Sequence, residues 1–105
     1  MAFSKAHLFD PTDQITSTFA KALSHPVRLD ILRTLSSKGA CPVDQLFSNY
    51  PLAKSTVSQH LEVLRETSLI KYVEEYPHTI YFPDFQTFNL YHKGLQDFCN
   101  KFLTK

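Results

Sequence analysis

The residues with the clearest chemical potential lie in one short stretch, "KSTVSQHLEVLRE", at positions 54–66. Its first half holds small hydrogen-bonding side chains. Val57, Leu61 and Leu64 are spaced i, i+4 and i+7, which places them on one face of a helix. The sequence therefore predicts a helix from about residue 53 or 54 to 67. Its apolar face should pack on the protein, while its polar start is either a capped helix end or a surface for a hydrogen-bonding partner.

Double-stranded DNA is a partner that suits this polar start. A helix that reads the major groove places donors and acceptors on base edges from its first turns. An amide such as Gln59 can pair with adenine, and Lys54 can contact phosphate or guanine. The residues that we expect to bind DNA from this helix are Lys54, Ser55, Thr56, Ser58, Gln59 and His60. Two alternatives stay open: Ser55 or Thr56 could serve only as a helix cap, and His60 could have a structural role.

The elements that must position this helix follow from caps and periodicity. By residue range, they are a helix over about 13–24, one from Pro26 to a stop at Gly39, a short helix over 43–47, strands over 70–74 and 79–82, and a last helix over about 86–103. Asp13 is the expected cap of the first helix. The second helix should bury Leu29 among its apolar residues. The strands alternate with period two, and their turn contains Pro77.

Helices followed by a helix-turn-helix and a hairpin define a winged helix-turn-helix, a mainly α fold with a β-hairpin wing. We expect residues 1–105 to form a single domain of this kind. The last helix carries a seam of large apolar residues spaced three and four apart, which packs either on its own core or on a second copy. We expect a homodimer whose interface contains Ile15, Phe19, Phe88, Tyr91, Leu95, Phe98 and Phe102.

Two separated motifs, "KALSHPVRLDILRTL" and "LAKSTVSQHLEVLRETSLIKY", closely resemble the ArsR/SmtB family of bacterial winged-helix transcriptional repressors. The resemblance covers roughly Phe19 to Phe82. It implies a homodimer that sits on a palindromic DNA operator and leaves when a signal arrives. It also implies a second DNA contact from the wing, for which the candidates are Lys71, Tyr76 and His78. The wing tip of the family is typically basic with glycine, whereas Glu74 and Glu75 make this one acidic, so its contact should be weak.

The sensor sites of the family have no recognisable counterpart here. Its Cys-x-Cys pair would fall on Pro42 and Asp44, neither of which is a thiol. A second metal site of the family uses the last helix, where His92 and Asp97 do not share a face. We therefore predict no metal and no cofactor, and the inducer is not identified by the sequence. A redox-sensing repressor that uses Cys41 and Cys99 is the alternative mechanism.

Composition sets the remaining limits. With 105 residues, 43% hydrophobic residues and a net charge of +1, the chain is expected to be a soluble domain with one modest core. It shows no membrane-length apolar run and no signal-peptide centre, so we expect a cytoplasmic protein without a membrane partner. Only two glycines occur, with no phosphate loop and no nucleophile elbow, which argues against an enzyme. A winged-helix module that binds another protein is the competing function.

Overall fold

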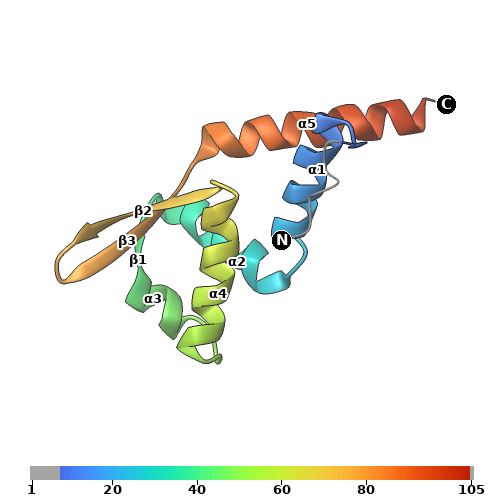
Figure 1. Cartoon of the computed structure of the whole chain (residues 1–105). Coiled ribbons are helices and arrows are strands. Elements are labelled where there is room, and N and C mark those ends of the chain that lie inside the picture. The colour runs from blue at the N-terminus through green and yellow to red at the C-terminus, as the bar shows by residue number, and fades with distance from the viewer. Residues whose placement is uncertain (1–7, 105) are drawn as a thin grey trace.

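The computed structural model describes residues 8–104, and it has the predicted elements in the predicted order, with one short strand added between the second and third helices (Figure 1). The helices are α1 (Pro11–Ala22), α2 (Pro26–Lys38), α3 (Val43–Ser48), α4 (Lys54–Glu66) and α5 (Phe85–Leu103). The strands are β1 (Cys41–Pro42), β2 (Ile70–Glu75) and β3 (His78–Pro83). The mainly α winged helix-turn-helix is thereby confirmed, with α3 and α4 as the helix-turn-helix and β2–β3 as the wing.

The start of α1 differs from the prediction. Its N-cap is Asp10, whose Oδ1 accepts a hydrogen bond of 2.7 Å from the backbone N–H of Thr12. Asp13 instead lies in the first turn, where its negative charge interacts favourably with the partial positive charge of the helix N-terminus. Pro11 explains the earlier start, because proline is well suited to the first helical position.

The boundaries of α2 follow the sequence signals. At its start, His25 is the N-cap, and its Nδ1 accepts a hydrogen bond of 3.1 Å from the N–H of Val27. At its end, Gly39 has a φ of 80°, and its N–H donates to the Leu35 carbonyl. A positive φ of this kind favours glycine, so the helix ends there.

The sheet has three antiparallel strands in the order β1-β3-β2. Ile70 pairs with Pro83 at the base of the wing, and Glu75 pairs with His78 at its tip. Strand β1 was not predicted from the sequence. It has only two residues and pairs Cys41 with Tyr81 on the other edge of β3.

One hydrophobic core joins the helices to the base of the wing. Its fully buried members are Phe19, Ala22, Ile31, Leu35, Cys41, Leu46, Val57, Leu61, Leu64, Leu69 and Ile70. Leu29, predicted to be buried, is 39% exposed, whereas its neighbour Arg28 is only 9% exposed. The predicted face of α2 is therefore wrong at this position, since a charged side chain takes the inner place.

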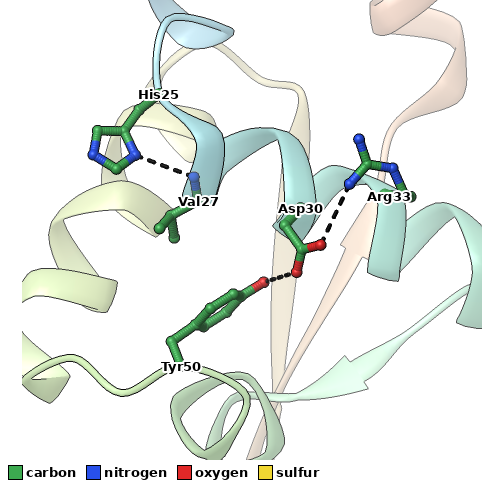
Figure 2. A network of polar contacts seen from close by, with 5 residues as sticks. All are labelled: His25, Val27, Asp30, Arg33 and Tyr50. Carbon is green, nitrogen blue, oxygen red and sulfur yellow. Dashed lines mark hydrogen bonds and ion pairs between the residues drawn. The ribbon is translucent and has the colours of Figure 1, made fainter.

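A polar contact also fixes the helix-turn-helix to α2. Tyr50, in the turn between α3 and α4, donates a hydrogen bond of 2.6 Å from its hydroxyl to Asp30 Oδ2 (Figure 2). The other oxygen of Asp30 pairs with Arg33 at 3.3 Å. Burial and the neighbouring Asp30 carboxylate both raise the pKa of Tyr50, so its hydroxyl remains a donor. The turn before α4 is thus held against α2.

Candidate nucleic-acid interface

Helix α4 divides into an inner and an outer face, as its sequence predicts. Val57, Leu61 and Leu64 are at most 2% exposed and pack in the core. Ser55, Ser58 and Gln59 are exposed, and Thr56 is half-buried. Because the apolar face fixes the helix against the protein, the polar face is held outward in one orientation.

The polar side chains at the start of α4 are not used as helix caps. The N-cap is Ala53, and no side chain caps the helix. Within residues 8–104, Ser55, Thr56, Ser58 and Gln59 make no side-chain hydrogen bond. These four side chains keep their full hydrogen-bonding capacity for a partner.

A positive charge accompanies these polar groups at the helix start. The ammonium of Lys54 lies 5.7 Å from the centroid of the Phe47 ring, a cation–π contact between α4 and α3. The N-terminus of α4 adds its own partial positive charge. Both features favour an anion, such as a phosphate group, at this end of the helix.

His60 is tied to the protein, unlike the other predicted DNA-binding residues of α4. Its Nδ1 lies 3.0 Å from Nη1 of Arg28, and its ring centroid is 4.2 Å from that of His25. Burial lowers the pKa of His60, and the nearby His25 and Arg28 lower it further. The ring is therefore neutral at pH 7 and takes part in a structural contact.

The second half of α4 exposes an ion pair. Arg65 Nε donates to Glu62 Oε1 at 3.1 Å, and its Nη2 contacts the other carboxylate oxygen. The hydrogen bonds from Arg65 lower the pKa of Glu62. Neither charge was predicted as part of the site, because a Glu and an Arg three residues apart are typical of any solvated helix face.

The wing presents the predicted candidates in two different states. Tyr76 and His78 are exposed at the tip, beside Glu74 and Glu75. Lys71 lies at the base, where its ammonium is 2.9 Å from Asp84 Oδ2. Lys71 thus makes an ion pair within the chain, while its exposed ammonium keeps further N–H donors, so its predicted contact with DNA stays a prediction.

Asp84 connects the wing to α5. Its Oδ1 accepts a hydrogen bond of 3.0 Å from the N–H of Thr87 and so caps α5, while its own N–H donates to the Leu69 carbonyl. The contacts with Thr87 and Lys71 lower the pKa of Asp84 to about 2. Asp84 is therefore charged at neutral pH and fixes the start of α5 at the base of the wing.

The predicted dimer face of α1 and α5 is largely exposed. Ile15, Phe88 and Phe98 are exposed, and Phe102 reaches 68% exposure. Tyr91 and Leu95 are half-buried against the core. The sequence prediction did not include Leu90 and Leu103, which are also exposed apolar residues of α5.

Phe19 differs from the other residues of the predicted interface, because it lies in the core of its own chain. Its ring stacks on Tyr91 at 5.3 Å and meets Phe88 edge-on at 5.2 Å. At 2% exposure, it is not available to a second copy. Phe19 therefore packs α5 against α1 within one chain.

The two thiols have different environments. Cys41 is buried, and burial raises the pKa of its thiol, whereas Cys99 is exposed on α5. Residues 8–104 contain no group of three or more His, Cys, Asp or Glu side chains placed to hold a metal ion. In the same part of the chain, no helix is both long and apolar enough to cross a membrane.

Comparison with known proteins matches residues 23–73 to a helix-turn-helix domain family. Among solved structures, a possible transcriptional regulator for arsenical resistance is 27% identical, with a TM-score of 0.63 over 78% of this chain and 80% of that one. The transcriptional repressor BigR from Xylella fastidiosa is 26% identical, with a TM-score of 0.63 over 92% of this chain and 98% of BigR. An ArsR-like transcriptional regulator from Rhodococcus has a TM-score of 0.74 at 19% identity, over 89% of this chain and 87% of that one, which is a likeness of fold.

Among proteins with curated descriptions, none matches the chain in sequence. The matched segment 23–73 contains α2, α3 and α4 with most of β2, and the structural matches extend the likeness over the wing and the outer helices. The chain therefore carries a helix-turn-helix domain within a winged-helix fold, and the resemblance to the ArsR/SmtB family that its two sequence motifs predict is confirmed.

Proposed function

We propose that this protein is a DNA-binding transcriptional regulator that represses transcription as a homodimer on a palindromic operator. The observation that carries the proposal is the outer face of α4. Ser55, Ser58 and Gln59 are exposed there, and none is used in a side-chain hydrogen bond within the described chain. A helix held rigidly from behind, with free donors and acceptors in front, has what base recognition in the major groove requires.

The homodimer is supported by the apolar face of α1 and α5. Exposed aromatic residues along one helix are costly in water unless a partner covers them. A second copy that covers them would place two α4 helices in one particle. Two such helices read successive major grooves about 34 Å apart, so the operator should be an inverted repeat.

The chemistry of α4 assigns separate roles to two of its residues. Gln59 carries an amide that can donate to and accept from one base pair, so it should read sequence. Lys54 offers a point charge at the helix start and should bind the DNA backbone, whatever the sequence. Ser55, Thr56 and Ser58 add shorter contacts, and Lys71, Tyr76 and His78 are the candidates from the wing.

Selection of binding sites from a randomised duplex library tests the proposal directly. The wild type should enrich an inverted repeat, with affinity that falls steeply as salt rises. No enrichment, together with no binding of a random duplex at low salt, would overturn the DNA-binding function. The competing protein-interaction function would then gain support, and the exposed acidic wing tip at Glu74 and Glu75 is the feature that favours it.

Two substitutions test the separate roles. Gln59→Ala should relax the preference at one position in each half-site, at a cost of about 1–3 kcal/mol per good base contact. Lys54→Ala should weaken binding to selected and random duplexes alike. It should also reduce the slope of log affinity against log salt concentration by about one per protomer. Gln96→Ala and Lys93→Ala make the same chemical changes at exposed positions on α5 and should leave DNA binding unchanged. Equal effects from the α4 and α5 variants would exclude α4 as the reading helix.

A further inference from the structure

Arg28 is a buried cation whose contacts gather three helices. Its Nε donates to the Ala22 carbonyl at 2.9 Å, and its Nη2 donates to the Lys21 carbonyl at 2.9 Å and to Ser24 Oγ at 3.0 Å. The two carbonyls belong to the C-terminal end of α1, while Arg28 itself lies in the first turn of α2. With three acceptors in place around a planar group, the guanidinium has one orientation.

The remaining nitrogen of this guanidinium contacts the reading helix. Nη1 of Arg28 lies 3.0 Å from Nδ1 of His60 on α4. A guanidinium carries donors only and does not lose its proton in proteins. The hydrogen bond therefore requires a lone pair on Nδ1, and the neutral ring must carry its proton on Nε2. Arg28 thus selects one of the two tautomers of His60.

The opposite nitrogen of the ring is without a partner in the described part of the chain and is not fully buried. In residues 8–104, the only buried side-chain nitrogen or oxygen without a hydrogen-bond partner is Thr16 Oγ1. His60 is half-buried, and its Nε2 makes no hydrogen bond within that part of the chain and is not fully buried. The His25 ring, whose own Nδ1 accepts from the N–H of Val27, packs on one side of the His60 ring and limits its rotation.

We propose that Arg28 is a positioning residue that fixes His60 as an Nε2–H donor to an acceptor on bound DNA, either a phosphate oxygen or a purine acceptor. This inference rests on the proposed function, since it names what one residue of α4 offers to DNA. The sequence left two alternatives for His60, a structural residue or a DNA contact. In this proposal His60 has both roles: Nδ1 makes the structural contact with Arg28, and Nε2 contacts DNA.

The first test needs no DNA. Nitrogen NMR of the full chain separates the protonated and unprotonated nitrogens of a histidine ring. In the wild type, His60 should show a proton on Nε2 and none on Nδ1 at neutral pH. Arg28→Lys should shift the ring toward a mixture of tautomers, because an ammonium does not reproduce the planar fork. A proton on Nδ1 in the wild type would overturn the proposal, even if the Arg28 variant does not fold.

The second test uses two substitutions, each of which keeps the function of one His60 nitrogen and removes that of the other. In His60→Asn, the amide oxygen can replace Nδ1 as the acceptor for Arg28, but the Nε2 donor is lost. In His60→Gln, the amide NH₂ can replace the Nε2 donor, but the Arg28 contact is lost. We expect His60→Asn to keep more of the thermal stability and to lose about tenfold in DNA affinity for each half-site, as for one lost hydrogen bond to a charged acceptor per protomer. His60→Gln should show the reverse order.

The duplexes used in this test are one selected by the wild type and a random duplex of equal length. An equal loss on both identifies a phosphate oxygen, and a loss on the selected duplex alone identifies a base acceptor. If His60→Asn binds both duplexes as tightly as the wild type, His60 is only structural and the proposal is wrong. A wild type that binds neither duplex contradicts the proposed function instead, while the tautomer of His60 is still decided by NMR.

Discussion

Removal of one aromatic side chain from α5 should dissociate the proposed homodimer. Phe98 is 51% exposed in the single chain, and its ring stacks on Phe102 with centroids 6.4 Å apart. A phenylalanine side chain buries about 200 Å², so cover by a partner removes roughly a further 100 Å² from water. At about 25 cal/mol per Å², this is about 2.5 kcal/mol for each copy, or about 2 kcal/mol after allowance for the Cβ that alanine keeps.

Two-fold symmetry in the proposed dimer would double this effect. In an isologous interface, each substitution occurs twice, so Phe98→Ala should cost about 4 kcal/mol per dimer. This corresponds to a rise of about 1000-fold in the dimer dissociation constant. Sedimentation velocity over a range of concentrations measures the change. The variant should also bind an inverted-repeat operator more weakly, because a monomer engages one half-site.

Leu52→Ala is the matched control for this experiment. Leu52 is 40% exposed in the turn before α4, so the change removes a similar apolar group from a different surface. It should leave the dissociation constant unchanged. A wild type that sediments as a monomer at micromolar concentration would refute the dimer, and equal effects of the two substitutions would refute the choice of face.

Two further predictions concern stability. Acidification below about pH 6.5 should lower the free energy of unfolding, because the pKa of His60 is lowered in the folded protein and the unfolded chain takes up a proton more readily. Urea unfolding at pH 7 and at pH 5.5 measures this loss of stability. The loss should be smaller in His60→Asn. Tyr50→Phe should lower the free energy of unfolding by about 1.5 kcal/mol, because it removes the hydrogen bond to the Asp30 carboxylate. Tyr76→Phe, at a fully solvated wing tip, is the control and should have no effect in the same urea assay.

The parts of the fold that the sequence predicts well are those fixed by local physics. Residues 25–26 and Gly39 bound α2 because proline, a capping side chain and a left-handed glycine each act within one turn. The period of α4 separates its inner from its outer face for the same reason. Asp10 and Asp13 show the limit of such signals, since either can cap a helix and only the position of Pro11 favours the earlier start.

Contacts between distant residues are what the sequence does not predict. Strand β1 exists only because β3 offers it a free edge, and two residues carry no periodicity. Lys71 reads as a free wing cation until the fold brings Asp84 within 2.9 Å of it. The burial of Arg28 in place of Leu29 was not predicted, because periodicity cannot reveal that hydrogen-bond acceptors surround the inner position.

These distant contacts connect the two surfaces on which the proposed function depends. α5 is held on α1 through Phe19, and α1 ends in the carbonyls of Lys21 and Ala22 that accept from Arg28. The same guanidinium contacts His60 on α4. One planar group is thus in contact with both the end of α1 and α4. The packing of α5 on α1 and the position of α4 are therefore joined through the contacts of one side chain, Arg28.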